Sequence, residues 1–169
     1  IAEGRVEDIV PCLYCNKCHD RVKGMWMSAC RVNPRMGIAH RLPIMSATAS
    51  GAHKKVAMIG GGPAGMRAAL LAAERGHAVT LFEQSGVLGG QLRHADHAAF
   101  KWALRDYKNY LIAQIARTPG IEVRLNTCAT PEEIRSGGYD AVIAACGASP
   151  VIPAIPGVEH TPHWTPLEV

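Results

Sequence analysis

The chain is 169 residues long, which is enough for one domain with an appendage. Its 48% hydrophobic and 19% charged residues are an ordinary globular balance. The net charge is +4, and the basic residues are scattered with no run longer than Lys54-Lys55, so the composition argues against nucleic-acid binding. No apolar stretch approaches the roughly 20 residues that a membrane-spanning helix needs, so we expect no membrane association. The first residues are unlike a secretory signal, and we expect a cytoplasmic protein that is a fragment of a longer chain or has been processed.

Composition divides the chain into four parts. Residues 1–45 are rich in Cys, Met, Arg and Pro and show no sustained helical or strand period, so we expect an irregular segment there. Residues 46–53 are small and polar and indicate a linker. Residues 54–150 alternate between strand and helix patterns, and we expect them to form the main domain. Residues 151–169 contain four prolines and predict extended backbone that leads to a further domain.

Four short apolar runs are typical of strands that are covered on both faces of a parallel sheet. In chain order they are Val56–Ile59, Ala78–Phe82, Ile121–Leu125 and Ala141–Ala145. The helices predicted between them are Pro63–Arg75, about His97–Arg117, and a short one that begins at Pro131 with Thr130 as its N-cap. The side chains expected on one face of the two longer helices are Met66, Leu70 and Ala73, and Trp102, Tyr107, Leu111 and Ile115. This order predicts an α/β fold with a doubly wound (Rossmann-like) parallel sheet, preceded by the irregular segment.

A glycine-rich turn directly follows the first predicted strand. Its sequence, Gly60-Gly61-Gly62-Pro63-Ala64-Gly65, fits the dinucleotide-binding pattern G-x-G-x-x-G. Gly60 suits a tight turn, Gly62 lets a pyrophosphate approach the backbone, and Gly65 lets the helix pack closely on the strand. Pro63 suits the first helical turn, where its missing N–H is not needed. The alternative is a glycine-rich turn that serves packing alone.

An acidic residue ends the second predicted strand, 18 positions after the last glycine of the turn. This residue, Glu83, can accept hydrogen bonds from the ribose hydroxyls of adenosine, and it would repel a 2′-phosphate, which argues against NADP at this site. We count Glu83 and the adjoining Gln84 among the candidate cofactor-binding residues. Residues Asn126–Ala129 follow the third strand, and we expect this stretch, including Ala129, to offer backbone groups to the adenine.

Four of the six cysteines lie close together in the irregular segment. They follow the spacing C-x2-C-x2-C-x11-C and are Cys12, Cys15, Cys18 and Cys30. Three thiolates at short spacing can bind three corners of a 4Fe-4S cluster, with the fourth ligand coming from farther along the chain. The spacing favours such a cluster over a zinc site or a disulfide framework, which both stay open as alternatives. We expect Met25–Met27 to form an apolar cover over the cluster, and Cys128 and Cys146 to be small packing residues.

Together these motifs resemble the iron–sulfur flavoenzymes related to 2,4-dienoyl-CoA reductase and trimethylamine dehydrogenase, an Old Yellow Enzyme-like family of NADH:flavin oxidoreductases. The likeness covers nearly all 169 residues. It is carried by Pro11–Asn16, Cys30–Pro34, Gly60–Gly65, Gly89-Gly90-Gln91-Leu92, and Tyr139–Ile143 leading to Ala145-Cys146-Gly147.

The resemblance implies a larger enzyme, in which an FMN-bearing β/α barrel precedes Ile1. The 4Fe-4S segment, an FAD-binding domain and an NAD(P)H-binding domain would follow that barrel. In the reductase branch, electrons would pass from NADPH through FAD and the cluster to FMN, and then to an enoyl thioester. By the same likeness, Gly89, Gly90 and Gln91 would lie along the phosphates or the flavin side of the cofactor. Residues Ala145–Gly147 would close over the pyrophosphate.

Two departures from the family pattern bear on function. The third cysteine, Cys18, follows after two residues, as in the amine-dehydrogenase branch, whereas the dienoyl-CoA reductase branch uses three. Cys146 also stands where the family usually has threonine. We identify no catalytic residue in the chain, no barrel and no second glycine pattern for NAD(P)H. The barrel and the NAD(P)H domain are therefore the expected partners, in the same polypeptide or as a partner subunit, and an oligomer is possible.

The leading interpretation is the electron-transfer portion of an FAD- and 4Fe-4S-dependent oxidoreductase. The first alternative is a module that holds ADP in the dinucleotide site without redox chemistry, as in the amine-dehydrogenase branch. The second is a small NAD dehydrogenase with a structural zinc.

Overall fold

The computed structural model describes residues 4–38 and 53–165. Residues 46–52 of the predicted linker lie outside this range. The centre of the fold is a parallel sheet of four strands in the order β3-β2-β1-β4. The strands are β1 (Lys55–Ile59), β2 (Ala78–Phe82), β3 (Ile121–Arg124) and β4 (Ala141–Ala144). The predicted α/β fold with a Rossmann-like parallel sheet is confirmed, and each strand was predicted to within one residue at either end.

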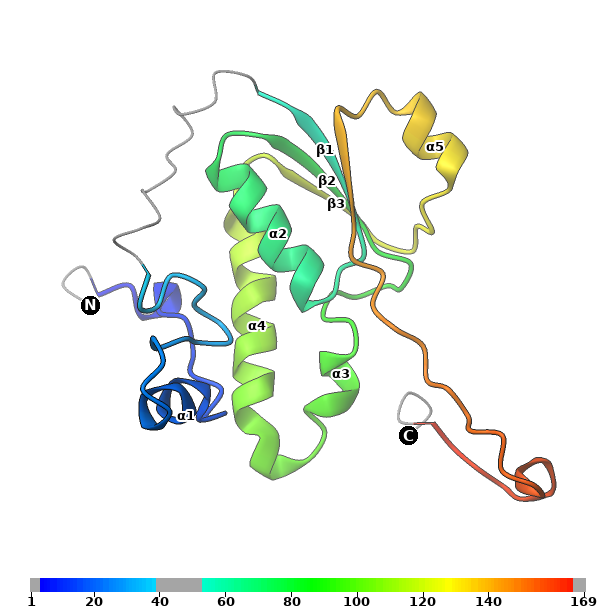
Figure 1. Ribbon diagram of the computed structural model, residues 1–169. Helices are drawn as coiled ribbons and strands as arrows, with labels where there is room; N and C mark the ends of the chain where they lie inside the picture. Colours follow the sequence, from blue (N-terminus) through cyan, green and yellow to red (C-terminus); the bar gives the residue numbers. More distant parts are fainter. Residues whose placement is uncertain (1–3, 39–52, 166–169) are drawn as a thin grey trace.

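Helices connect the strands in the manner that the strand order requires. Between β1 and β2 runs α2 (Pro63–Glu74), and α4 (Trp102–Arg117) precedes β3. The chain then reverses direction across the sheet to reach β4, and the right-handed crossover rule places the next helix, α5 (Pro131–Ser136), on the opposite side. Figure 1 shows α2 and α4 together on one side of the sheet and α5 on the other. No helix in the described residues is long and apolar enough to cross a membrane.

The hydrophobic core lies between β1, β2 and the paired helices. Its largest fully buried side chains are Met58, Met66, Leu81 and Leu111, whereas the equally buried Phe82 lies on the other face of the sheet against Tyr139. Strands β1 and β2 are covered as predicted, but β3 and β4 are not. On β4, Val142 and Ile143 point to opposite faces and are 49% and 40% exposed. The described residues therefore cover only the centre of the sheet on both faces.

The predicted helix faces are partly correct. Met66 and Leu70 are buried, but Ala72 takes the place expected for Ala73. In α4 the buried positions recur every four residues, at Ala103, Tyr107, Leu111 and Ile115, whereas Trp102 at the first position is 46% exposed. Trp102 was therefore assigned to the wrong face.

The helix predicted over His97–Arg117 starts later than expected. A separate one-turn helix, α3 (Leu92–Ala95), comes first, followed by a 3-10 turn, η3 (Ala99–Lys101). Between them Ala98 is extended, with φ −68° and ψ 133°, which interrupts the helix. The N-cap prediction is confirmed, because Thr130 Oγ1 accepts a hydrogen bond from the Glu133 N–H at 3.2 Å.

The irregular segment contains more regular structure than its sequence indicated. It forms a 3-10 turn, η1 (Val6–Asp8), and a helix of seven residues, α1 (Lys17–Lys23), which is too short to show a clear hydrophobic period. In the tail, the predicted extended backbone is interrupted by a 3-10 turn, η4 (Val158–His160).

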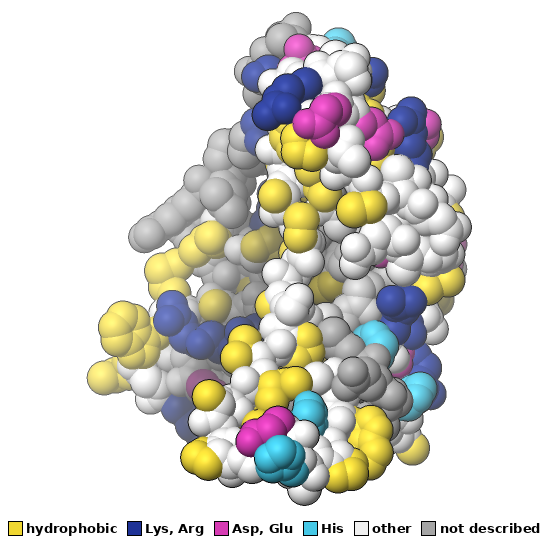
Figure 2. Space-filling model, turned by 90° about the vertical axis from the view of Figure 1, so that its right-hand side faces the viewer, with side chains coloured by type: hydrophobic (Ala, Val, Ile, Leu, Met, Phe, Trp, Pro, Cys, Tyr) yellow, Lys and Arg dark blue, Asp and Glu magenta, His cyan; other side chains and the backbone are white. Residues whose placement is uncertain are grey.

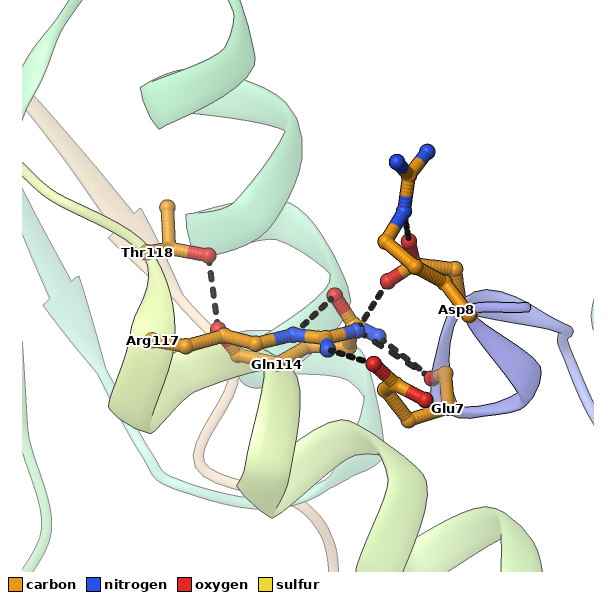
Figure 3. Close-up of polar contacts among 6 residues, drawn as sticks. Glu7, Asp8, Gln114, Arg117 and Thr118 are labelled. Atoms are coloured by element: carbon orange, nitrogen blue, oxygen red, sulfur yellow. Dashed lines mark hydrogen bonds and ion pairs between the residues drawn. The ribbon is translucent and has the colours of Figure 1, made fainter. Parts of the chain in front are cut away.

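The N-terminal segment is attached to α4 by polar contacts at the C-terminal end of that helix (Figure 3). Gln114 Nε2 and Arg117 Nη2 each donate a hydrogen bond to the Glu7 carbonyl at 3.1 Å, and Arg117 also forms an ion pair with Asp8. Of the residues described between 4 and 38, only Val32 is buried, and it joins the core beside α2 and α4. The segment is thus held mainly at its surface.

A buried ion pair joins α3 to α4. Asp96 follows α3 directly and is 5% exposed, and its carboxylate binds the Lys108 ammonium. Arg105 Nη2 donates a hydrogen bond to the Asp96 carbonyl at 2.8 Å. The one-turn helix α3 is therefore held in place by charge rather than by its own length.

Replacing one partner of this pair should destabilise the fold. We expect Lys108→Met to lower the free energy of unfolding by about 2–4 kcal/mol, because the Asp96 carboxylate would stay buried without its counter-charge. Chemical denaturation monitored by circular dichroism measures the change. The exposed Lys101→Met is the control and should change stability by less than about 0.5 kcal/mol. Equal stability of the two variants would contradict a structural role for the pair.

Candidate functional site

The candidate site is built on the turn after β1. Gly60 has φ +108°, a conformation that other residues rarely adopt, and its N–H donates to the Phe82 carbonyl at 2.8 Å. A Cβ on Gly60 would lie 2.3 Å from the carbonyl oxygen of Ala145. The carboxyl ends of β1, β2 and β4 therefore meet at Gly60, and a ligand crevice in an open α/β sheet lies at this edge.

The other two glycines of the G-x-G-x-x-G pattern, Gly62 and Gly65, have different roles. A Cβ on Gly65 would lie 1.8 Å from the Gly60 carbonyl oxygen, so only glycine permits α2 to approach the turn. A Cβ on Gly62 would have its nearest neighbour at 3.8 Å, the Cα of Gly90, so Gly62 is not required for internal packing. Pro63 and Ala64 open the first turn of α2, whose free N–H groups and helix dipole favour an anion beside Gly62.

A second glycine turn, at the end of the loop after β2, lies against the first. The Gly89 N–H donates to the Gly61 carbonyl at 2.9 Å, and Gly90, with φ +52°, could not carry a Cβ because it would lie 2.8 Å from the Gly62 Cα. Gln91 Nε2 then donates to the Ala148 carbonyl in the loop after β4. The predicted residues from these three loops are thus brought together.

Residues Ala145–Gly147 complete this edge of the sheet. The Ala145 N–H donates to the Ile59 carbonyl at 2.7 Å, which continues the pairing of β4 with β1. Gly147 has φ +75°, and within the described residues no atom beyond its chain neighbours lies within 4 Å of where its Cβ would be. Conformation rather than crowding therefore favours glycine at position 147.

Glu83 is the most elaborately held side chain of the site. It is 8% exposed, and its Oε2 accepts a hydrogen bond from the Gly61 N–H at 2.7 Å. Its Oε1 lies 2.8 Å from both the backbone nitrogen and the hydroxyl of Ser85. The carboxylate thus connects the end of β2 to the turn after β1.

These contacts keep Glu83 ionised. Burial raises the pKa of the Glu83 carboxyl. The opposing effect is larger, because hydrogen bonds from Ser85 and Gly61 and the charge of Arg93 all lower this pKa, and it lies below its ordinary value. A depressed pKa of this kind contributes stability above the ordinary glutamate pKa, and the contribution is lost as the pH falls through the lowered value.

Arg93 on α3 places a positive charge near the second glycine turn and acts on Glu83. Its Nε donates to the Gly90 carbonyl at 3.3 Å, and its side chain would be 3.1 Å from a Cβ on Gly89. Sequence reasoning passed over Arg93 and Ser85. The signal for Ser85 was its position two residues after the candidate ribose ligand, and Arg93 follows the second glycine turn by three residues.

The predicted adenine-binding stretch lies beside Glu83 at its beginning. The Thr127 N–H donates to the Glu83 carbonyl at 2.9 Å, and the Asn126 N–H donates to the Ser85 carbonyl at 3.0 Å. Ala129 lies two residues farther on and is half-buried, and Gln84 is exposed next to Glu83. The backbone geometry thus places Asn126 and Thr127, rather than Ala129, against the chain at Glu83 and Ser85.

Three cysteines of the N-terminal segment lie at the start of α1, and Cys30 packs against the hydrophobic core. Cys12 and Cys15 are exposed, whereas Cys18 and Cys30 are half-buried. The chain turns sharply between the first three, because Tyr14 and Asn16 adopt φ of 53° and 54°. The Tyr14 N–H donates to Cys12 Sγ at 3.3 Å, the kind of amide hydrogen bond that metal-bound thiolates accept.

The thiol groups are not gathered into a metal site. Across residues 4–38 and 53–165, no group of three or more His, Cys, Asp or Glu side chains has metal-binding geometry. What fits a cluster is the donor chemistry, four thiols with an amide donor to the first of them. The predicted apolar cover is not packed either: Met25 is 97% exposed, and Trp26 lies under the Arg21 guanidinium.

The cysteine segment contacts the α/β domain through α4. The rings of Tyr14 and Trp102 lie 5.0 Å apart, and Leu13 and Cys30 pack against the core. Cys146, predicted as a packing residue, and Cys128 are both exposed, so that prediction is wrong for this structure.

Comparison with known proteins agrees with this geometry. The sequence signature of the pyridine nucleotide-disulphide oxidoreductases matches residues 54–166, which include the whole sheet and both glycine turns. The chain belongs to this family. Membership of this family makes the chain part of an oxidoreductase, whereas its cofactors are inferred from the site.

Longer relatives extend the match to the cysteine segment. An NADH oxidase of Thermoanaerobacter brockii is 41% identical over 160 residues, which are 93% of this chain and 24% of the oxidase. The structure of a 2-naphthoyl-CoA reductase bound to 2-naphthoyl-CoA covers 94% of this chain and 24% of the reductase, with 37% identity and a TM-score of 0.85. The structure of histamine dehydrogenase from Rhizobium sp. 4-9 covers 86% of this chain and 22% of the dehydrogenase, with 30% identity and a TM-score of 0.77. The predicted family resemblance is thus confirmed, and the chain spans about a quarter of such proteins.

The different environments of Gly62 and Gly65 give a paired prediction. We expect Gly62→Ala to fold with nearly unchanged stability but to lose bound nucleotide, because its methyl group would occupy the surface that an anion approaches. Gly65→Ala should lower the melting temperature as well, because its methyl group would overlap the Gly60 carbonyl. Thermal denaturation and quantitation of released nucleotide separate the two effects. Full nucleotide retention by Gly62→Ala would contradict the site.

Proposed function

We propose that this chain is the part of an NAD(P)H-dependent flavin oxidoreductase that binds FAD and a 4Fe-4S cluster. Its role is to pass electrons between the reduced FAD and an FMN-bearing barrel. The observation that carries the proposal is one arrangement. An ionised, buried Glu83 accepts a hydrogen bond from Gly61, whose chain neighbour Gly62 has an unfilled surface, in a domain to which the four-cysteine segment is attached.

The ADP part of FAD would lie across the carboxyl ends of β1, β2 and β4. The pyrophosphate would meet the N-terminus of α2 at Gly62, and the ribose hydroxyls would donate to Glu83. Residues Gly89–Gln91 would border the phosphates and the flavin side, and Ala145–Gly147 would lie over the pyrophosphate. Figure 2 views the molecule from the side of α5 and the tail, and shows hydrophobic side chains spread over this face among charged groups and histidines.

Cys12, Cys15, Cys18 and Cys30 are the proposed ligands of the cluster. Soft thiolate ligands suit iron–sulfur clusters, and they must stay reduced, which is the normal state in the cytoplasm. When bound, the FAD accepts two electrons as a hydride and the cluster transfers electrons singly, so that the pair links two-electron and one-electron chemistry. The chain itself contributes position: the contacts of α4 with residues 7, 8 and 14 fix the cysteine segment relative to the nucleotide site.

The substrate and the remaining cofactors belong to parts beyond this chain. We propose an FMN barrel and an NAD(P)H-binding domain as partners, and an enoyl thioester or a related compound as the electron acceptor. Supporting this, one relative is named an NADH oxidase and another a 2-naphthoyl-CoA reductase. The same site would also serve a second candidate function, with ADP held in place of FAD and no redox role. The C-x2-C-x2-C spacing and the likeness to histamine dehydrogenase favour that alternative.

Glu83 should determine how tightly the nucleotide is held. We expect Glu83→Gln to weaken binding of FAD or ADP by about 1–3 kcal/mol at pH 7, because it removes a charged acceptor of ribose hydrogen bonds. Equilibrium binding measures the loss, and mass spectrometry of the nucleotide released from the native protein decides between FAD and ADP. The exposed Glu74→Gln is the charge-matched control and should bind normally. Unchanged affinity in Glu83→Gln would place the ribose elsewhere.

The cluster is tested by a pair of exposed cysteines. Anaerobically prepared protein should contain about four iron and four sulfide per chain, with a broad brown absorbance. Cys15→Ser should lose most of this iron, because it removes one ligand, whereas Cys128→Ser should keep it. Stoichiometric zinc without iron would contradict the cluster and favour the zinc alternative.

A further inference from the structure

Ser85 has a contact pattern that the proposed function does not use. Its hydroxyl oxygen lies 2.8 Å from Glu83 Oε1 and also 2.8 Å from the Val87 carbonyl oxygen. A serine hydroxyl carries a single hydrogen, so it can donate fully to only one of these acceptors at a time. The structure therefore presents a donor with two equally distant acceptors, one on the ribose-binding carboxylate and one on the loop that leads to the second glycine turn.

We propose that Ser85 is a positioning residue whose hydroxyl donates to Glu83 in the nucleotide-free protein and turns to the Val87 carbonyl when the adenosine ribose binds. The proposal deepens the proposed function and rests on the placement of the ribose at Glu83.

The number of acceptor positions on the carboxylate makes this exchange necessary. A carboxylate offers about four positions, two on each oxygen. In the described part of the chain, Oε1 is filled by the N–H and hydroxyl of Ser85, and Oε2 has one position filled by the Gly61 N–H. One position is left, whereas a ribose presents two neighbouring hydroxyls. For both to bind Glu83, the Ser85 hydroxyl has to release Oε1.

The free protein needs this donor for a different reason. Glu83 is 8% exposed and ionised, and a buried charge without enough donors is costly. The charged side chain that acts on it is Arg93, which is oriented toward the Gly90 carbonyl, so the donors that contact the carboxylate come from Ser85 and Gly61. The Ser85 hydroxyl thus donates a hydrogen bond to the carboxylate until a ribose hydroxyl takes its place. It then donates to the Val87 carbonyl instead.

The exchange has a measurable energetic sign. A hydrogen bond to a charged acceptor is stronger than one to a neutral carbonyl, so removing the hydroxyl costs the free protein more than the ribose-bound one. Ser85→Ala should therefore bind ADP more tightly than the native protein does. Its affinity for 2′,3′-dideoxy-ADP, which has no ribose hydroxyl to trigger the exchange, should stay the same.

The experiment is a calorimetric titration of the full-length protein, freed of bound nucleotide, with ADP and with 2′,3′-dideoxy-ADP. We expect Ser85→Ala to increase the ratio of the dideoxy-ADP Kd to the ADP Kd by about fivefold over the native ratio. Ser85→Thr keeps a hydroxyl and should restore the native ratio. If Ser85→Ala does not fold, Ser85→Gly removes the same hydroxyl and should give the same increase.

If Ser85 has only a structural role, Ser85→Ala would weaken the binding of both nucleotides equally and leave the ratio of their Kd values unchanged. This result would overturn the proposal. A decreased ratio would also overturn it, because Ser85 would then only orient Glu83 for the ribose. If the native protein binds the two nucleotides equally, the ribose does not contact Glu83, and the proposed placement fails together with the exchange. A native preference for ADP that Ser85→Ala leaves unchanged refutes the exchange alone.

Discussion

The organisation of the site depends on how closely three strand ends approach one another at Gly60. The Gly60 N–H is bonded to β2, and its α-carbon faces the Ala145 carbonyl at the end of β4. This approach excludes side chains from positions 60 and 65, and it leaves the N-terminus of α2 directed at the same edge of the sheet. The Glu83 carboxylate at the end of β2 then accepts a hydrogen bond from Gly61 in the turn after β1. A helix N-terminus that favours an anion and a buried carboxylate are thereby set side by side, as the proposed dinucleotide site requires.

The second glycine turn links the loops at this edge of the sheet by hydrogen bonds. Gly89 is bonded to Gly61, and Gln91 reaches across to Ala148. The α3 helix that follows has four residues and would not be stable alone, so the buried pair of Asp96 and Lys108 determines where it lies. Since Lys108 belongs to α4, the helix that holds the cysteine segment also holds the loop that borders the cofactor site. Helix α4 thus fixes the position of both the cysteine segment and the loop beside the candidate cofactor site.

The strands and glycine turns could be predicted from sequence because their signals are local. A continuous apolar run predicts a central strand, and G-x-G-x-x-G needs only its neighbours. The misassigned features depend on contacts between distant residues. The break before Trp102 follows from the attachment of Asp96 to Lys108, twelve residues along. The role inferred for Ser85 is different, because its two acceptors are each only two residues away; what no residue pattern encodes is that its hydroxyl lies 2.8 Å from both. The exposure of β4 reflects what covers it, and the sequence of the strand alone does not contain that information.

The cysteine segment shows why the proposed electron transfer belongs to a larger assembly. Among its described residues only Val32 is buried, and Met25 and Trp26 are 97% and 67% exposed. Solvent exposure and hydrogen bonding to sulfur both set the reduction potential of an iron–sulfur cluster, so a surface that covers this segment would also tune it. The attachment through Glu7, Asp8 and Tyr14 fixes one side of the segment against α4 and leaves the apolar side chains around α1 free to contact another domain. The relatives that it matches are about four times as long as this chain. The loops of the candidate nucleotide site, in contrast, are hydrogen-bonded to one another within the described residues. The proposed cluster segment is therefore the part of this chain that gains more from a covering surface.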